Sequence, residues 1–388
     1  MAGQLVSQLG DKFHMIALAF WVLNSTGSSG KMGAVLAASL LPSLIIGLFS
    51  GSFIDRYSKK KIIVGTDLIR GMVLLGFAWM FAKGQMNFHL ILVLQAILSI
   101  NAAFFDPAIP AVIPRIVPKD SLARANAVHQ GINSFALIGG AVLGGMAVAG
   151  LGIGWIFVLN GFSFFISGGF EFLIEIPEKK DIETRSRLVS EIWAGYNYLL
   201  NSRPLMGVLS MVMVIHFFVG GIEVVMPVVA AQGPGRGAEL LGLFQAALGA
   251  GTLVMSLFLT RFTIAGKEKT ALFSSVVAMG GIQGAASFIP GLGILAPAGF
   301  ALCFFAWGGA MIRAAVAFKT LLQSYTDNAF QGRVFALAST VGNASVPVSM
   351  IVSGFLLDRI SAETGLAISG AILAGLGMVS LKFLKEEK

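Results

Sequence analysis

The sequence predicts an all-α integral membrane protein in which about twelve transmembrane helices form two pseudo-symmetric six-helix bundles. Three observations predict this fold class: an apolar composition, many stretches of membrane-spanning length, and a division into two similar halves. Of the 388 residues, 56% are hydrophobic and 12% are charged, whereas a soluble domain has about 25% charged residues. Most of the chain must therefore lie in lipid or against other helices.

Long apolar stretches recur along the whole chain, and a helix needs about 20 apolar residues to cross a bilayer. The first stretch lacks a basic lead-in and a small-residue cleavage site, so we expect a retained span and not a signal peptide. Glycine is abundant, which favours close helix packing, as in the fifth stretch. The stretches cover roughly residues 3–23, 33–54, 62–82, 89–113, 125–149, 155–176, 205–230, 239–260, 270–289, 293–318, 334–357 and 362–383.

The net charge of +8 follows the membrane topology and does not indicate a nucleic-acid partner. With both termini in the cytoplasm, about 20 Lys and Arg residues fall on the cytoplasmic side, as the positive-inside rule requires. Those expected outside are Lys31, Lys83, Arg236 and Arg359. We therefore predict a multi-pass protein of the cell membrane with both ends inside the cell.

The densest charge run, EKKDIETRSR at 178–187, divides the stretches into six and six. We predict an N-terminal bundle at 1–176, a cytoplasmic linker with an amphipathic helix on the membrane surface at 177–204, and a C-terminal bundle at 205–388. A shift of 209 residues aligns Arg124 with Arg333 and Gly145 with Gly354. This weak repeat indicates duplicated halves, with a substrate site near the bilayer midplane between them.

Short polar motifs interrupt the apolar chain and suggest a family. The segment from Gly51 to Lys61 reads GSFIDRYSKKK and resembles the G-x-x-x-D-R-x-G-R-R signature of the major facilitator superfamily. Further motifs are LGD at 9–11, DLIR at 67–70, the segment 104–128 and QGRVF at 331–335. Together they resemble the drug:proton antiporter branch that includes macrolide-efflux proteins, and are similar to enterobactin exporters and lysophospholipid transporters. The short basic lead-in usual in that branch is missing here.

This resemblance implies a cytoplasmic gate. It places Gly51, Asp55 and Arg56 opposite Gly332 and Arg333, at the start of the eleventh span. There the N-terminal helix dipole and an arginine would both stabilise a carboxylate. The neighbouring lysines have a simpler explanation as positive-inside anchors.

Other charged residues within spans need partners. Asp67 and Arg70 are three residues apart on one helix, so they are expected to pair beside the gate. Asp106 either pairs with an arginine near the following loop or lines the cavity. Arg313 needs an acceptor, for which Asp106 or a substrate are candidates. The loop arginines available to Asp106 are Arg115 and Arg124.

Asp11 and Glu223 are the candidate proton carriers because they lie in the first spans of the two halves. A carboxylate costs a few kcal/mol in hydrocarbon, and a carboxyl group in apolar surroundings binds protons readily. His14, three residues after Asp11, could relay protons. Alternatively, Asp11 caps or pairs near the cytoplasmic leaflet, and His14 is a packing residue.

These features predict a secondary transporter and not an enzyme. The sequence has no phosphate-binding loop, no H-E-x-x-H motif and no Cys/His cluster, so we expect neither ATP hydrolysis, a metal nor a cofactor. The leading hypothesis is a monomeric exporter of hydrophobic or amphipathic small molecules, coupled to protons or Na⁺. The alternative is a lysophospholipid flippase, and a receptor or an intramembrane enzyme is less favoured. Phenylalanines that could line an apolar cavity are Phe104, Phe105, Phe162, Phe164, Phe165, Phe217, Phe218, Phe304 and Phe305.

Overall fold

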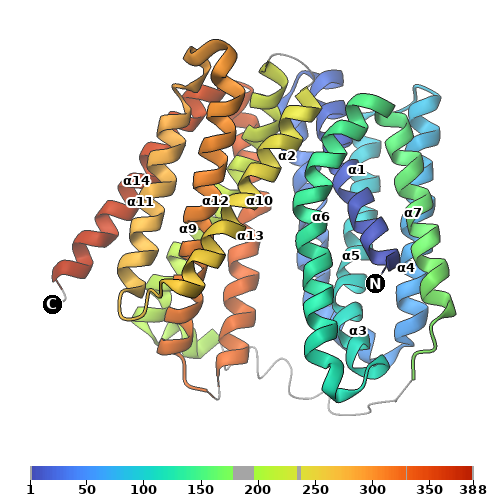
Figure 1. Cartoon of the computed structure of the whole chain (residues 1–388), viewed down its shortest axis with the longest axis horizontal. Helices are drawn as coiled ribbons and strands as arrows, with labels where there is room; N and C mark the ends of the chain where they lie inside the picture. The colour runs from blue at the N-terminus through green and yellow to red at the C-terminus, as the bar shows by residue number, and fades with distance from the viewer. Residues whose placement is uncertain (1, 178–195, 234–236, 329, 387–388) are drawn as a thin grey trace. The chain divides into compact units, whose positions relative to one another are not determined.

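A computed structural model of the chain describes residues 2–177, 196–233, 237–328 and 330–386. Helices account for most of these ranges (Figure 1). The first set is α1 (Ala2–Thr26), α2 (Ser29–Ala38), α3 (Leu41–Arg56), α4 (Lys59–Ala82), α5 (Phe88–Ile116), the 3₁₀ turn η1 (Lys119–Ser121), α6 (Leu122–Leu151) and α7 (Ile153–Leu173). The second set is α9 (Arg203–Gln232), α10 (Gly237–Arg261), α11 (Glu268–Ala286), η2 (Ile289–Leu295), α12 (Ala296–Tyr325), α13 (Gln331–Leu357) and α14 (Ala362–Glu386).

The all-α membrane fold predicted from the sequence is confirmed. Each predicted stretch corresponds to a long helix within the described ranges, if α2 and α3 are taken as one broken span. Ten helical segments in these ranges are long and apolar enough to cross a membrane by length and composition. The more polar α1 and α11 are not among the ten. The chain is thus a multi-pass membrane protein.

Side-chain caps and prolines define where several helices begin. The Ser28 hydroxyl accepts a hydrogen bond from the backbone N–H of Lys31 at 3.1 Å. The Asn87 side chain accepts one from Leu90 at 3.0 Å. These caps satisfy N–H groups that have no partner within the first turn of a helix. Pro42 lies in the first turn of α3 and separates that helix from α2, so the predicted span at 33–54 is broken.

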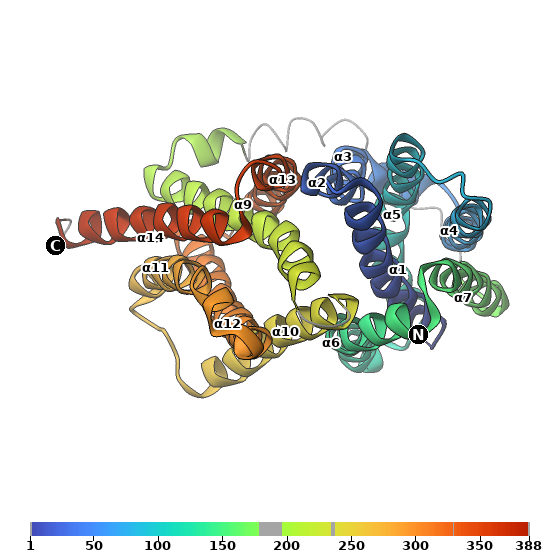
Figure 2. The same cartoon turned by 90° about the horizontal axis from the view of Figure 1, so that it is seen from above.

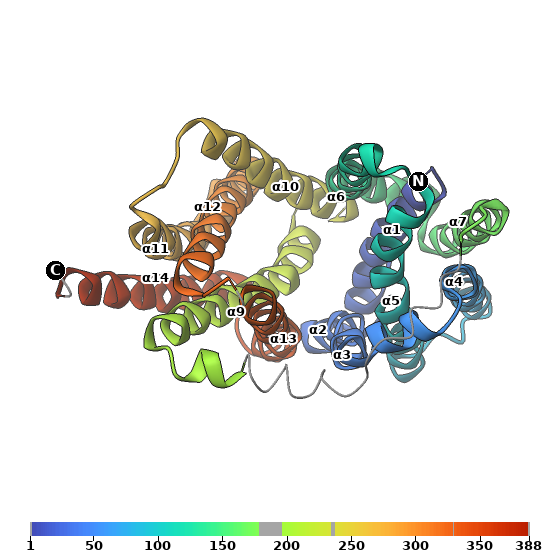
Figure 3. The ribbon, with the colours of Figure 1, turned by 90° about the horizontal axis from the view of Figure 1, so that it is seen from below.

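The chain forms two compact units. Unit 1 comprises Met1–Glu183 with Gly235–Ala246, and unit 2 comprises Thr184–Pro234 with Ala247–Lys388. In unit 1, α1 packs against α6 and α7, α4 lies along α7, and α5 contacts α3 and α4 (Figure 2). In unit 2, α9 pairs with α13, and α11 packs between α12 and α14 (Figure 3).

Glycines bring neighbouring helices into close contact, as the composition predicted. A side chain at Gly144 on α6 would collide with Phe13 on α1. In unit 2, Gly280 of α11 and Gly370 of α14 meet with no room for a Cβ on either. Small residues at such crossings let backbones approach, which is how helices associate in lipid.

The predicted linker lies mostly outside the described residues, and only its end can be assessed. Residues 196–200 are helical. Leu199 is buried in a hydrophobic cluster of unit 2, whereas Tyr196 and Leu200 are exposed, so the predicted surface position of the linker stays a prediction. The Tyr198 ring stacks on Phe330 with centroids 4.5 Å apart, and its hydroxyl accepts the Asp327 N–H at 3.1 Å. The linker end is therefore attached to the turn between α12 and α13.

Candidate functional site

A polar cavity of about 520 Å³ lies in unit 1 between α1, α5 and α6. Nine of its thirteen lining residues are polar or charged, which is unusual inside a bundle of apolar helices. The volume suits a small molecule or a group of waters. The lining residues are Gln4, Gln8, Asp11, Lys12, Phe105, Asp106, Ile109, His129, Gln130, Asn133, Ser134, Ala136 and Leu137.

Arg70 on α4 does not line the cavity itself, but its positively charged guanidinium lies next to Asp106, which does. Its Nη2 is 4.0 Å from Oδ1 of Asp106 on α5, and the Arg70 side chain is 9% exposed whereas that of Asp106 is 72% exposed. The guanidinium also lies 4.8 Å from the Phe105 ring centroid and 5.3 Å from that of Phe164. Aromatic faces stabilise a weakly hydrated guanidinium, so a buried arginine is held at the cavity by an ion pair and two rings.

Asp11 on α1 faces the same cavity and is positioned by α7. The Asn160 Nδ2 donates to Asp11 Oδ1 at 3.4 Å. Asn160 is itself buried and accepts a hydrogen bond from the Ser163 hydroxyl at 3.2 Å. Arg70 and Lys12 both interact electrostatically with Asp11. The structure thus places Asp11 and Asp106 on one cavity wall with Arg70 behind them.

Asp67 and Arg70, which the sequence predicts to pair, attract each other electrostatically, but the ion pair of Arg70 is made with Asp106. Asp67 is fully buried, and among the described residues neither of its carboxylate oxygens has a well-formed hydrogen bond. The spacing of three residues permits the pair, but Arg70 points to α5, where Asp106 and the Phe105 ring both attract it. Asp106 consequently lines the cavity and pairs with an arginine that the sequence did not suggest for it.

His14 belongs to a packed interior. Its Nε2 lies 3.0 Å from the Gln95 Oε1, and its ring packs against Phe77 and Phe157 at centroid distances of 5.3 Å. The hydrogen bond of His14 is therefore made to α5 and not to Asp11. This arrangement supports the packing alternative for His14.

Arg313 on α12 finds its acceptors within unit 2. Its Nη1 donates to the hydroxyls of Ser274 at 2.9 Å and Ser275 at 3.1 Å, both on α11. Two neighbouring serines thus accept the hydrogen bonds of Arg313, for which the sequence had suggested Asp106 or a substrate as the acceptor. Glu223, the second predicted proton carrier, is half-buried in α9.

The predicted gate is only partly described. Gly332 and Arg333 begin α13, and the Arg333 guanidinium lies 5.6 Å from the centroid of the Phe330 ring. The side chains at Gly51, Asp55 and Arg56 lie outside the described part of the structure. The gate therefore stays a prediction.

Sequence reasoning missed Glu171, which is buried near the end of α7 and is 8% exposed. None of its oxygens accepts a hydrogen bond in the described structure. Its signal was an acidic residue between aromatic residues in the sixth stretch, one turn before Glu175. The adjacent charge run after residue 177 obscured that signal, because an acid there resembles the beginning of a cytoplasmic loop.

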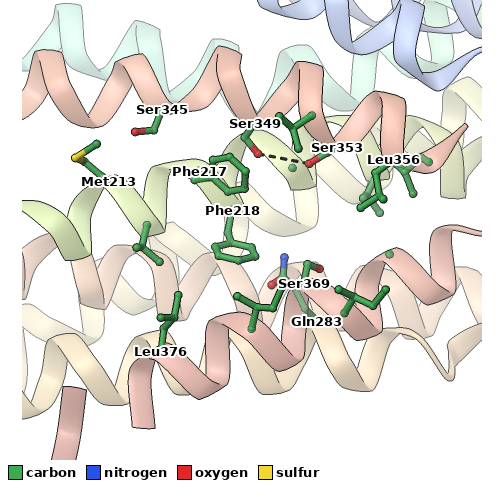
Figure 4. A pocket seen from close by; sticks show the side chains of 18 residues that line it. Met213, Phe217, Phe218, Gln283, Ser345, Ser349, Ser353, Leu356, Ser369 and Leu376 are labelled. Carbon is green, nitrogen blue, oxygen red and sulfur yellow. Dashed lines mark hydrogen bonds between the residues drawn. The ribbon is translucent and has the colours of Figure 1, made fainter. Parts of the chain in front are cut away.

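A second, apolar cavity of about 500 Å³ lies in unit 2 between α9, α11, α13 and α14 (Figure 4). Phe217 and Phe218 line it, and none of its lining residues carries a charge. Its polar groups are serines and the amide of Gln283, which is 3% exposed and whose Oε1 has no hydrogen-bond partner among the described residues. Such a wall suits a neutral, mostly apolar molecule.

Known proteins similar to this chain are membrane transporters. Macrolide efflux protein A of Streptococcus pyogenes is 22% identical and covers 97% of this chain and 93% of that protein. Multidrug efflux pump Tap of Mycobacterium tuberculosis is 25% identical, with coverage of 98% and 92%. The crystal structure of a bacterial homologue of the iron transporter ferroportin, in an inward-facing state, has the same fold. It matches with a TM-score of 0.74 at 15% identity, over 98% of this chain and 96% of that chain.

The family model agrees with these similarities and with the helix order. The model described as Major Facilitator Superfamily matches residues 1–350, which is most of the chain. The membrane-spanning helical fold, the sequence motifs and the similar proteins all indicate the same family. The chain belongs to the major facilitator superfamily.

Proposed function

We propose that this protein is a proton-coupled exporter of hydrophobic or amphipathic small molecules and works by alternating access, without enzymatic chemistry. Two relatives are named as efflux proteins, which supports the direction of transport. The uncharged cavity in unit 2 supports an apolar substrate. We further propose that the protein acts as a monomer in the cell membrane.

One observation supports proton coupling most directly: Asp11 and Asp106 line a polar cavity and share the buried Arg70. Both carboxyl groups can exchange protons with water in this cavity. Protonation of Asp106 would neutralise the partner of Arg70, and deprotonation would restore the ion pair. A group whose ion pairs depend on proton binding can shift the equilibrium between two conformations.

The composition of the apolar cavity supports the lysophospholipid alternative less well than the exporter. A phosphate headgroup needs cationic or multiple N–H partners, and no lysine or arginine lines that cavity. An aromatic or mostly apolar molecule needs only the serine hydroxyls, the Gln283 amide and the phenylalanine rings of the cavity. The two hypotheses therefore differ in whether the transported molecule carries an anionic phosphate group.

Flux into proteoliposomes that contain the purified protein would test the proposal. An imposed pH gradient should drive ethidium transport, a protonophore should abolish it, and a Na⁺ gradient without a pH gradient should not drive it. Liposomes without protein control for passive leakage. Movement of a fluorescent lysophospholipid in place of ethidium would favour the alternative, and no movement of either would reject transport of both substrate classes.

A topology experiment would test the proposed orientation. We expect both termini and the charge run at 178–187 to be cytoplasmic. In a Cys303→Ala background, a cysteine introduced at Lys180 should react with a membrane-impermeant maleimide only after cells are opened. A cysteine introduced at Lys83, which is expected outside, serves as the matched control. Labelling at position 180 in intact cells would contradict this topology.

The gate leads to a further expected result. Asp55→Asn should slow turnover and favour the inward-open state, because the amide loses the charge that the α13 N-terminus and Arg333 would stabilise. The expected loss in the rate is about tenfold for about 1.4 kcal/mol. Cysteine accessibility from the cytoplasmic side would report the shift in conformation. Wild-type turnover and accessibility would remove Asp55 from the gate.

A further inference from the structure

Two carboxyl groups lie deep in unit 1, where α4 packs along α7 (Figure 2). The Asp67 Cβ lies 3.3 Å from the point that a Cβ on Gly168 would occupy. Glu171 is three residues after Gly168 and so lies on the same face of α7. The two carboxyl groups interact directly with each other across this contact.

The surroundings of this pair do not satisfy two negative charges. Asp67 is 0% exposed and Glu171 is 8% exposed, and within the described residues none of their four carboxylate oxygens has a well-formed hydrogen bond. Ser167 lies beside Asp67 and Gln4 beside Glu171, and both are buried, but neither the Ser167 Oγ nor the Gln4 Oε1 has a hydrogen bond of good geometry to the described residues. An ionised carboxylate in such a place costs several kcal/mol unless it is paired, and two adjacent ones repel each other.

The charged groups nearby do not remove this conflict. Arg70, on the same helix as Asp67, is drawn to Asp106 and to Asp11 as well. Lys60, the second residue of α4, has its Nζ 5.2 Å from the centroid of the Phe172 ring. Lys12 lies beside Asp11, and the N-terminal amino group attracts Glu171. The buried guanidinium of Arg70 is thus shared by three carboxyl groups, those of Asp11, Asp67 and Asp106.

A route for a proton is present. A small cavity of about 70 Å³ borders Glu171, Gln4 and Lys60. It has room for one or two waters, each of which occupies about 30 Å³. Gln4 and Ile109 line both this small cavity and the larger polar cavity that contains Asp11 and Asp106. Water in the small cavity would connect the buried pair to that wall.

We propose that Asp67 and Glu171 form a shared proton-binding site that holds one proton between them and exchanges it with water beside Gln4. In the exchange, a carboxyl O–H bond breaks and the proton passes to water, which leaves two carboxylates, of which that of Asp67 is attracted by Arg70. The reverse transfer restores the pair, and no other bond changes. The assignment of this proton as the coupling ion rests on the proposed function, whereas its binding does not.

Infrared difference spectroscopy of the full-length protein in lipid nanodiscs would test proton binding without transport. At neutral pH the wild type should show the carbonyl stretch of a protonated carboxyl group in a dry site, and it should disappear at high pH. Glu171→Gln and Asp67→Asn should both remove this band. Glu175→Gln, four residues along the chain at an exposed position, should retain it. A band that persists in both pair variants, or that is absent from the wild type, would overturn the proposal.

Transport measurements separate this inference from the proposed function. Glu171→Gln should lower pH-driven ethidium flux about tenfold or more, which corresponds to 1.4 kcal/mol or more, while exchange without a gradient survives. If the single variants do not fold, the double variant Asp67→Glu with Glu171→Asp keeps two acids and should keep the band. Loss of the infrared band in this double variant would count against a shared proton. If the wild type shows the band but no pH-driven flux, proton-coupled export is rejected while proton binding by the pair stands.

Discussion

Arg70→Met is expected to abolish most pH-driven transport, because it leaves Asp11, Asp67 and Asp106 without the buried cation that attracts all three. Methionine fills much of the space between the two aromatic rings but provides no charge. Removing one partner of a buried pair costs about 3–5 kcal/mol, and the exposure of Asp106 reduces this value. A loss of about tenfold or more in initial ethidium flux is the expected result.

A double-mutant cycle would show whether Arg70 acts through Asp106. Asp106→Asn alone should reduce pH-driven flux, and the combination with Arg70→Met should be little worse than Arg70→Met alone. Arg70→Lys keeps the charge but loses the planar stacking on Phe105 and Phe164, so it should be intermediate. Additive losses in the double variant would show that the ion pair seen at 4.0 Å has no part in transport.

Asp11→Asn should uncouple export from the pH gradient. The asparagine side chain can still bond to Asn160, so the local packing is retained while the titratable group is lost. We expect pH-driven ethidium flux to fall to the level of protein-free liposomes, whereas exchange of labelled for unlabelled substrate continues. Asp120→Asn, which removes an exposed aspartate from the turn before α6, is the matched control and should behave like the wild type.

Glu223→Gln tests whether the acid in the first span of the C-terminal half also couples export to the pH gradient. If Glu223 shares the coupling proton, exchange should survive while pH-driven flux stops. If it is a structural group, the variant should lose thermal stability and both activities together. Continued pH-driven flux in the Asp11 and Glu223 variants would move the coupling site to Asp106 or to the buried pair.

Much of the architecture was predictable from the sequence. The apolar stretches marked the positions of the helices, including the unusual helix α5 that contains three prolines. Positively charged loops suggested an orientation, and the motifs around Asp55 and Arg333 suggested the family that the whole-chain comparison supports. These signals are local, because each segment enters lipid according to its own hydrophobicity and length.

The polar partners were decided by the tertiary structure. The sequence allowed Arg70 to pair with Asp67, but helix packing brings Asp106 and two aromatic rings to its guanidinium. Likewise, Arg313 bonds to serines of α11. A polar group in an apolar bundle binds whichever partner the neighbouring helix presents, because water is absent and the cost of an unpaired group is high.

The sequence by itself determined that this protein spans a membrane many times and carries acids inside those spans. Only the folded chain decided which acids meet: Asp11 and Asp106 at a polar cavity, and Asp67 and Glu171 in the buried contact between α4 and α7. The physical reason is that insertion into lipid sums contributions along one segment, whereas the charge state of a buried group depends on neighbours that lie far apart in the chain.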